Sequence, residues 1–345
     1  MNHNRSRRVH LVYDVDGWAF HGTCRDIEKY APAGWELVSM PEAEFARLPE
    51  TDLGRADAVL HFSWYAHRPE LRVRQACVVA NHGCEHDPWP CRGSRGSCDH
   101  GSHDWPAVAA TRTRNRQAAA ERLPRFDAVL CVNPLLAARV REWNPRAEFL
   151  PIGIDGEIFA PRSPLERDSS QKLRVGWCGQ LDDPPFPNQK GFEWVFQPVR
   201  ERCASFCEFE VNTRNYKTGL DRAAMGGWYD GIDVFLCTSI SEGSPNTAME
   251  ALACGRPVVG TAVGDLPQLV RSGETGYATG TYQDADSAAQ VIERSCAALR
   301  ALAADRDLLV RMGESARRTM EAERNWRTLA PRWLAAITGA GEVAA

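Results

Sequence analysis

Short apolar runs alternate with amphipathic segments along the first half of the chain. The segments 21–31, 106–122 and 134–142 have a helical pattern, whereas the apolar runs are short enough to be buried strands. Strands that alternate with helices favour parallel pairing in a doubly wound α/β sheet. The runs expected to form these strands lie at 8–15, 35–40, 56–64, 76–82, 126–133 and 147–153.

The same alternation begins again after a polar, proline-rich stretch at 160–171, which is typical of a linker. The chain ends in helices expected from about 284 to 338. We therefore expect two doubly wound domains, 1–165 and 166–324, with a cleft between them and ligands outside the carboxyl ends of the strands. The strands of the second domain are expected at 172–179, 207–212, 233–239, 256–262 and 275–280.

The composition fits two ordinary globular domains. Of the 345 residues, 43% are apolar and 25% are charged, and the net charge of -4 gives no reason to expect a nucleic-acid partner. No apolar run approaches the roughly 20 residues that a transmembrane helix needs. The start of the chain lacks the apolar core of a signal peptide, so we expect a cytoplasmic location.

The segment 237–279 carries the most informative chemistry. Its strand ends near Ser239, and a helix is expected to begin at about Pro245 with Ser244 as the N-cap. Gly255 and the proline that follows at 257 are expected to end this helix. The amino end of the helix would then lie at the carboxyl end of a strand, where its free N–H groups and dipole suit a phosphate.

Two acidic residues flank this expected anion site. Glu242 lies on the loop before the helix, and Glu250 lies in its second turn, four residues after Asn246. A carboxylate beside a phosphate is unfavourable unless it binds another group. Because an ionised carboxylate only accepts hydrogen bonds, the hydroxyls of a sugar or a ribose are its natural partners.

This segment resembles the retaining nucleotide-sugar glycosyltransferases of family four, whose Glu-x7-Glu element matches the stretch from Glu242 to Glu250. The resemblance includes "VGWCGQL" and "NQKGF" within 175–192, "LPIGIDGEIFAP" at 150–161 and "RNWRTLAPRWL" at 324–334. It implies the GT-B fold, in which two Rossmann-like domains face a central cleft and a C-terminal helix, here 325–345, crosses back to the acceptor-side first domain. It also implies a hexosyltransferase that uses a UDP- or GDP-sugar.

The resemblance assigns roles to individual residues. Glu250 would hold the ribose of the nucleotide, Glu242 would contact hydroxyls of the transferred sugar, and Lys190 would neutralise the diphosphate. His82, at the end of the run 76–82, would face the donor sugar from the first domain. The resemblance thus predicts His82, Glu242 and Lys190 as the catalytic residues. The other donor contacts expected from the resemblance are Ser244, Pro245, Asn246, Thr247, Gly179, Gln180, Asp16 and Gly17.

One residue departs from the pattern of the family. Gln180 stands where the family usually has an arginine, and a glutamine brings no positive charge to the diphosphate. Losing a charge-assisted hydrogen bond costs about 1.5–3 kcal/mol unless another group replaces it. Arg214 and Lys217 follow the next expected strand, and we hypothesise that Arg214 supplies the missing charge.

By resemblance, the acceptor attacks from the face of the leaving phosphate, so no protein nucleophile is required and the anomeric configuration is retained. The diphosphate needs no metal, and the acceptor hydroxyl belongs to an unidentified partner in glycan, glycolipid or natural-product biosynthesis. Two alternatives stay open. The chain would be a GT-B epimerase of the nucleotide sugar, or a catalytically weak homologue that only binds nucleotide sugars.

The polar stretch 81–105 contains three cysteines and four histidines. It begins at the end of the expected strand 76–82 of the first domain. One interpretation is an acceptor-binding or lid loop that includes Glu85, His86 and Trp89. Another is a structural zinc site, although its six-residue gaps are wider than those of a zinc knuckle. A disulfide between Cys91 and Cys98 is the third interpretation. The zinc ligands would be Cys84, Cys91, Cys98 and a histidine such as His100.

Overall fold

Two parallel sheets organise the part of the chain that the structure describes. The computed structural model describes residues 6–80, 116–165, 168, 170–181, 189–213, 219–282 and 285–339. The chain divides into two units. The first unit comprises Met1–Asn81, Arg112–Gly153 and Arg324–Ala345, and the second comprises His82–Thr111 and Ile154–Glu323.

The first unit contains a six-stranded sheet with the order β2-β1-β3-β4-β5-β6, and all its neighbouring strands are parallel. Of the four inner strands, β3, β4 and β5 are almost entirely buried, which explains their continuous apolar sequences. The strands are β1 (Arg7–Tyr13), β2 (Trp35–Pro41), β3 (Ala58–His61), β4 (Arg74–Val79), β5 (Ala128–Cys131) and β6 (Ala147–Phe149).

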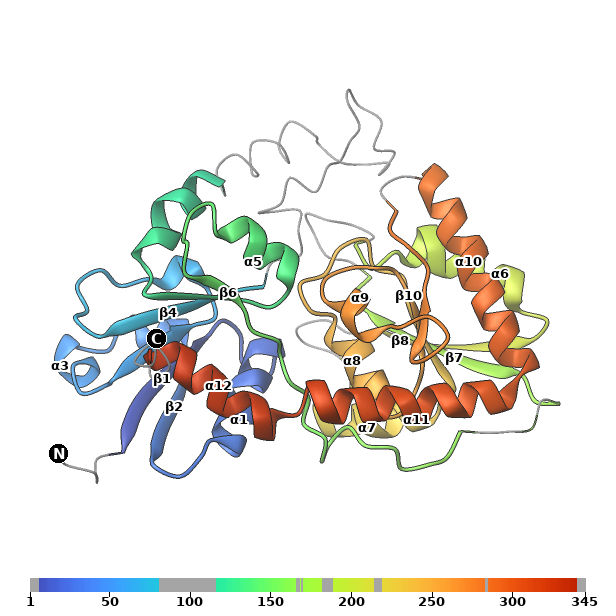
Figure 1. Ribbon diagram of the computed structural model, residues 1–345, viewed down its shortest axis with the longest axis horizontal. Coiled ribbons are helices and arrows are strands. Elements are labelled where there is room, and N and C mark those ends of the chain that lie inside the picture. Colours follow the sequence, from blue (N-terminus) through green and yellow to red (C-terminus); the bar gives the residue numbers. More distant parts are fainter. Residues whose placement is uncertain are drawn as a thin grey trace. The chain divides into compact units, whose positions relative to one another are not determined.

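The helices of the first unit come from both ends of the chain. The last one, α12 (Trp326–Thr338), contacts α1 and the strands β3, β4 and β5 (Figure 1). Its buried residues recur at helical spacing, so one apolar face meets the sheet: Trp326, Leu329, Ala330, Trp333, Leu334 and Ile337. Other helices of this unit are α1 (Ala19–Tyr30), α2 (Glu42–Phe45), α3 (Glu50–Leu53) and α5 (Pro134–Val140), with short 3-10 turns at η1 (Trp64–Ala66) and η2 (Leu123–Arg125). Residues 116–122 are helical as well.

Polar contacts and close packing hold α12 in place. The indole N–H of Trp333 donates to the carbonyl oxygen of Pro151 at 3.0 Å. The Nε–H of Arg74 donates to the carbonyl oxygen of Ile337 at 3.0 Å. A Cβ atom on Gly153 would lie 2.7 Å from the Trp326 ring, so only glycine allows the ring to pack there.

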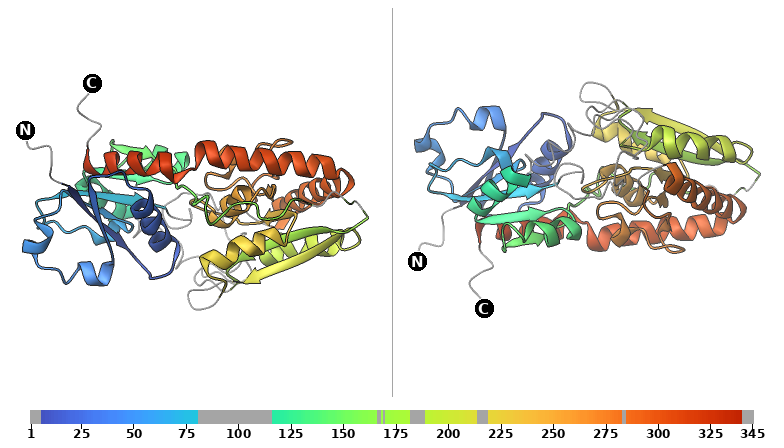
Figure 2. Two further views of the ribbon diagram at one scale, coloured as in Figure 1. Left: turned by 90° about the horizontal axis from the view of Figure 1, so that it is seen from below. Right: turned by 90° about the horizontal axis from the view of Figure 1, so that it is seen from above.

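The second unit contains a five-stranded parallel sheet with the order β11-β10-β9-β7-β8. β7 and β8 lie side by side in every view (Figures 1 and 2). The strands are β7 (Leu173–Gly179), β8 (Cys207–Thr213), β9 (Val234–Cys237), β10 (Val258–Gly260) and β11 (Gly276–Ala278). The helices are η3 (Phe192–Phe196, a π-helix), α6 (Gln197–Cys203), α7 (Arg222–Asp230), α8 (Asn246–Ala253), α9 (Leu266–Leu269), α10 (Ala285–Ala304) and α11 (Arg306–Glu323).

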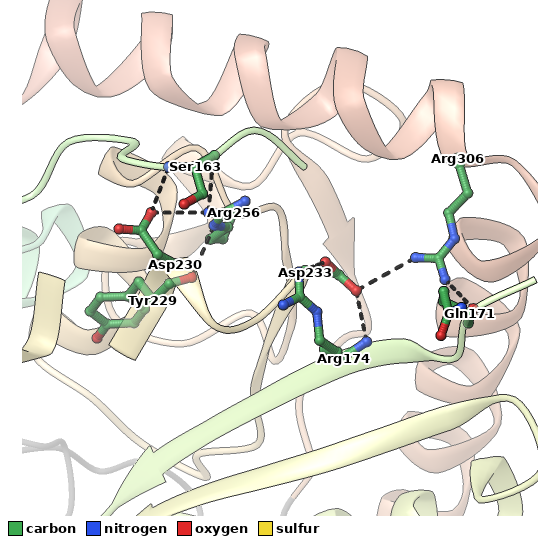
Figure 3. Close-up of polar contacts among 8 residues, drawn as sticks. All are labelled: Ser163, Gln171, Arg174, Tyr229, Asp230, Asp233, Arg256 and Arg306. Atoms are coloured by element: carbon green, nitrogen blue, oxygen red, sulfur yellow. Dashed lines mark hydrogen bonds and ion pairs between the residues drawn. The ribbon is translucent and has the colours of Figure 1, made fainter. Parts of the chain in front are cut away.

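An aspartate directly before a strand recurs in both units. Asp57 and Asp127 each accept the backbone N–H of the residue opposite them on the neighbouring strand, at 2.7 and 2.9 Å. Asp233 does the same for Arg174 at 2.8 Å, and it also accepts a 2.7 Å hydrogen bond from the Arg174 guanidinium (Figure 3). Arg306 lies 3.6 Å from the same carboxylate. These aspartates tie the amino ends of neighbouring strands together.

The strands agree closely with the sequence prediction. Each apolar run expected as a strand overlaps one of the strands β1 to β11, and the doubly wound α/β class is confirmed. Some strands begin later than expected, because an aspartate stands directly before the first residue of the strand. In the run 126–133, for example, the strand β5 begins only at Ala128, after Asp127.

A histidine is buried within the first unit. His61 ends β3 and is fully buried, with its Nε2 3.1 Å from the amide oxygen of Gln75. Within the described part of the chain its Nδ1 has no hydrogen-bond partner. Burial lowers the pKa of His61 to about 3, although the Gln75 hydrogen bond opposes the shift. A second proton would thus be placed on a nitrogen without an acceptor.

We expect the substitution His61→Leu to make the protein less sensitive to acid. The unfolded chain protonates this histidine near pH 6.5, whereas the folded protein does so only at about 3. The stabilisation by neutral His61 is therefore complete above about 6.5 and is lost as the pH falls, with about 2 kcal/mol lost at about pH 5. Urea unfolding of both proteins at about pH 7.5 and about pH 5 measures the difference. An equal loss of stability in the two proteins would contradict this prediction.

Candidate active site

The strand order of the second unit marks a position for a ligand. β7 pairs with β8 on one side and with β9 on the other, so the order of the strands reverses at β7. In open parallel sheets, ligands bind outside the carboxyl ends of the strands at such a switch point. The carboxyl ends in question are Gly179 of β7 and Cys237 of β9, and the candidate site is built on the segments that follow them.

The loop between β9 and α8 is fixed by buried polar contacts. Thr238 is 1% exposed, and its hydroxyl oxygen accepts the indole N–H of Trp177 at 2.9 Å. The same hydroxyl donates to the carbonyl oxygen of Lys190 at 2.6 Å. The hydroxyl of Tyr282 donates to the carbonyl oxygen of Thr238 at 2.6 Å. These contacts hold the segment around Lys190 against the loop after β9.

Two glycines with positive φ make this close packing possible. Gly191 has a φ of 67°, and a Cβ atom there would lie 2.0 Å from the Thr238 carbonyl oxygen. Gly264 has a φ of 58°, and its Cβ atom would lie 2.5 Å from the carbonyl oxygen of Gly243. Both positions therefore need glycine for two reasons, the backbone conformation and the space.

Lys190 and Glu242, both predicted as catalytic, contact each other directly. The ammonium of Lys190 bonds to Oε1 of Glu242, and this oxygen also accepts the hydroxyl of Ser239 at 2.7 Å. The Glu242 side chain is only 4% exposed, whereas that of Lys190 is 26% exposed. Burial lowers the pKa of Lys190, but the charge and hydrogen bond of Glu242 outweigh it, so the pKa is raised overall. Lys190 is therefore a cation at neutral pH.

The helix α8 begins one residue later than predicted. It runs from Asn246 to Ala253, and its N-cap residue is Pro245 rather than Ser244. Ser244 makes no capping bond, because its hydroxyl instead donates to the Asp265 carboxylate at 3.1 Å. The carbonyl oxygen of Pro245 accepts the N–H groups of residues 248 and 249. The first backbone N–H groups of any helix lack intrahelical partners, so those of Asn246 and Thr247 suit an anion.

The carboxyl end of α8 agrees with the prediction. Gly255 has a φ of 69°, and its N–H donates to the carbonyl oxygen of Leu252 at 3.0 Å. The N–H of Arg256 donates to the carbonyl oxygen of Ala251 at 2.8 Å. This pair of bonds is the Schellman motif, which ends the helix at the glycine that the sequence indicated.

Glu250 is the second buried carboxylate of the site. It is 8% exposed, and its Oε2 accepts the hydroxyl of Tyr229 at 2.8 Å. Gly179, at the end of β7, lies beside the stem of Lys190, since a Cβ atom there would be 3.1 Å from the lysine Cγ. Gln180 follows directly. The described part of the second unit therefore brings Lys190, Glu242 and Gly179 together, and joins Glu250 to them through the short helix α8.

Asp16 and Gly17 belong to the first unit, on the loop after β1. The Asp16 carboxylate accepts the hydroxyl of Tyr13 at 2.7 Å. Gly17 has a φ of 74° and donates its N–H to Nδ1 of His21 at 2.8 Å, while the His21 ring stacks on Tyr13. Sequence reasoning did not single out His21, and its spacing of four residues from Gly17 is the only local signal. A role of this loop towards a nucleotide sugar stays a prediction.

The remaining predicted site residues lie outside the described residues, so their roles stay predictions. Among the residues that the structure describes, no group of three or more His, Cys, Asp or Glu side chains is placed to hold a metal ion. Likewise, no helix in the described ranges is long and apolar enough to cross a membrane. The predicted site residues that lie outside the described residues are His82, Cys84, Glu85, His86, Trp89, Cys91, Cys98, His100, Arg214 and Lys217.

The segment that carries this site is similar to parts of known glycosyltransferases. Residues 172–297 match the family described as glycosyl transferases group 1, and this range includes Lys190, Glu242 and Glu250. A D-inositol 3-phosphate glycosyltransferase of Streptomyces bingchenggensis is 36% identical over 92 residues, which are 27% of this chain and 18% of that protein. An alpha-maltose-1-phosphate synthase of Mycobacterium tuberculosis is 35% identical over 101 residues, 29% of this chain and 26% of that protein. The matches thus span only about a fifth to a quarter of these relatives.

Solved structures resemble the whole chain in fold. A sucrose-phosphate synthase from Thermosynechococcus elongatus has a TM-score of 0.68 at 16% identity, covering 98% of this chain and 100% of that one. The Anabaena HepE protein in complex with UDP and glucose has a TM-score of 0.64 at 12% identity, covering 96% of this chain and 100% of that one. The predicted fold class, two Rossmann-like parallel-sheet domains as in GT-B glycosyltransferases, is confirmed.

We expect Gly191→Ala to destabilise the second unit more than a glycine substitution in open space. Gly273→Ala is a matched control, because Gly273 has a φ of 85° but no atom within 4 Å of its Cβ position. The control should lose about 1–2 kcal/mol, the cost of the left-handed conformation alone. Gly191→Ala adds the clash with Thr238 and should lose clearly more. Urea unfolding of the three proteins tests this, and equal losses would contradict it.

Proposed function

We propose that this chain is a retaining glycosyltransferase, which moves a hexosyl group from a UDP- or GDP-sugar to an acceptor hydroxyl. The observation that carries the proposal is the contact of Lys190 with Glu242 at the switch point of the second sheet, next to the amino end of α8. The match of residues 172–297 to the glycosyl transferases group 1 family supports the class of reaction. The named activities of the relatives and the UDP and glucose bound to HepE support the class of donor.

The diphosphate would bind between Lys190 and the first turn of α8. Departure of the nucleoside diphosphate places negative charge on the leaving phosphate while the sugar gains oxocarbenium character. The Lys190 ammonium stays charged because Glu242 raises its pKa. The Lys190 ammonium and the N–H groups of Asn246 and Thr247 are fixed in place before the charge develops. Such preorganised positive groups stabilise the transition state and so lower the activation barrier of the transfer.

The two carboxylates would bind hydroxyl groups of the donor. Glu250 would hold the ribose, and Glu242 would contact the transferred sugar. Oε1 of Glu242 already accepts Lys190 and Ser239, which supports a binding role rather than that of a nucleophile. Retention would then follow from attack by the acceptor on the same face as the leaving phosphate, whose oxygen takes the proton of the acceptor.

The acceptor side stays a prediction from the sequence. The first domain predicted from the sequence, 1–165, would supply it, with His82, Asp16 and Gly17 towards the donor sugar and Glu85, His86 and Trp89 on an acceptor loop. A structural zinc site in that loop, compensation of Gln180 by Arg214 and a cytoplasmic location are likewise predictions.

Product analysis separates the proposed reaction from its alternatives. The protein is incubated with UDP-glucose, UDP-N-acetylglucosamine or GDP-mannose and with p-nitrophenyl glycosides as acceptors. We expect release of the nucleoside diphosphate and a glycosylated product with retained anomeric configuration, measured by NMR. An isomerised nucleotide sugar without this release indicates an epimerase, and binding without turnover indicates a binding homologue. If none of the nucleotide sugars binds in a calorimetric titration, the proposal is wrong.

We expect Lys190→Met to lower kcat by about 10²–10³-fold, because it removes a preorganised charge from the leaving group. Lys172→Met is the matched control. Lys172 precedes the amino end of β7, at the opposite edge of the sheet, and its ammonium donates to the carbonyl oxygen of Ala204. The control should keep its kcat within about twofold. Steady-state rates with the best donor measure both variants, and similar losses in both would refute the role of Lys190.

A further inference from the structure

Tyr229 is a buried residue that contacts Glu250, the carboxylate proposed to bind the ribose. It lies in α7, its side chain is fully buried, and its hydroxyl lies 2.8 Å from Oε2 of Glu250. The same hydroxyl lies 2.9 Å from the carbonyl oxygen of Thr247, in the first turn of α8. Neither the Glu-x7-Glu spacing nor the strand-end pattern points to this tyrosine.

A phenol has one proton, so the two acceptors compete for it. The Glu250 carboxylate is the stronger acceptor, because hydrogen bonds to a charged group are about twice as strong as those between neutral groups. Burial and the charge of Glu250 raise the pKa of Tyr229 well above its ordinary value. Tyr229 therefore keeps its proton at neutral pH and can donate it to Glu250.

The tyrosine is itself held on several sides. Its ring makes edge contacts with Phe159, Trp228 and Phe235 at centroid distances of 6.3, 5.1 and 6.1 Å. Its carbonyl oxygen accepts the Nε–H of Arg256 at 2.9 Å (Figure 3).

Arg256 is anchored in turn, with 1% of its surface exposed. Its guanidinium donates to the Asp230 carboxylate at 3.1 Å and to the carbonyl oxygen of Ser163 at 3.0 Å (Figure 3). A chain of hydrogen bonds thus leads from the segment at Ser163 through Arg256 and Tyr229 to Glu250. The phenol cannot move away from the carboxylate without breaking this packing.

We propose that Tyr229 is a positioning residue that holds Glu250 in the orientation needed to accept the ribose hydroxyls, and that it thereby makes the donor site selective for ribonucleotides over deoxyribonucleotides. This proposal rests on the proposed function, since it deepens the role of Glu250 there. A free glutamate side chain loses rotamer entropy when it binds a ligand. A glutamate that Tyr229 already orders loses less, and this advantage exists only for a ligand that offers the hydroxyl.

Calorimetric titration of the full chain with UDP, dUDP, GDP and dGDP tests the proposal. For the base that binds more tightly, uracil or guanine, the wild type should bind the ribonucleotide about 10–100-fold more tightly than the deoxynucleotide. This ratio of affinities corresponds to one hydrogen bond to a charged group. Tyr229→Phe should reduce this preference by about 2–10-fold, the cost of ordering one side chain. The affinity for the deoxynucleotide should fall less, because it lacks the 2′-hydroxyl that the ordered carboxylate accepts, whereas Lys190 still binds its diphosphate. A merely structural role of Tyr229 would weaken both ligands alike.

Control variants separate positioning from packing. Tyr282→Phe removes another buried hydroxyl of the same unit, one that donates to a backbone oxygen, and should keep the ratio of ribonucleotide to deoxynucleotide affinity. The double variant Tyr229→Phe, Glu250→Gln should show the same ratio as Glu250→Gln alone, because Tyr229 acts through Glu250. Glu250→Asp keeps the charge but withdraws the carboxylate from the phenol, so it should lose the preference even if Tyr229→Phe does not fold.

The outcomes distinguish the two proposals. If the wild type binds none of the four nucleotides, the proposed function fails. If it prefers ribonucleotides and Tyr229→Phe keeps the full preference, only the positioning role of Tyr229 is overturned. Full preference in Glu250→Asp would also overturn the ribose-binding role of Glu250. A reduced preference in both variants, with an unchanged ratio of ribonucleotide to deoxynucleotide affinity in Tyr282→Phe, is the result we expect.

Discussion

The pairing of β7 with β9 is the constraint on which the candidate site depends. These strands are not neighbours in the sequence, and their parallel register, with Val175 opposite Val234, aligns their carboxyl ends. Gly179 and the loop after Cys237 are thereby brought to one edge of the sheet. The two glycines at 191 and 264 then allow backbone segments to approach more closely than side chains would permit. Lys190, Glu242 and Glu250 lie on the segments that follow these two strand ends.

The fold could be predicted from the sequence to the level of its strands. Each buried strand is a short apolar run with polar flanks, and burial on both faces removes the need for any finer pattern. The order of the strands could not be predicted, because it depends on which distant run pairs with which. The ends of strands were also missed. Asp233 bonds to the backbone of Arg174, and nothing near either residue in the sequence announces that contact.

The candidate site was predictable where a motif repeats a local arrangement, as for Glu242, Glu250 and Lys190. It was not predictable where a contact joins distant elements. Ser244 follows the usual rule for an N-cap, yet the Asp265 carboxylate offers its hydroxyl a charged acceptor, and the helix begins later. Ser239 bonds to Glu242, and Tyr229 reaches Glu250 from another helix. Such contacts depend on tertiary packing, which overrides local preference.

The helix α12 has a consequence for how the chain is made. The first unit needs this helix to cover its sheet, since Trp326 and Trp333 are fully buried against residues that precede the second unit. During synthesis the ribosome releases the second unit before it releases α12. The first unit therefore completes its core only after the whole second unit has been translated, although its sheet comes first in the sequence.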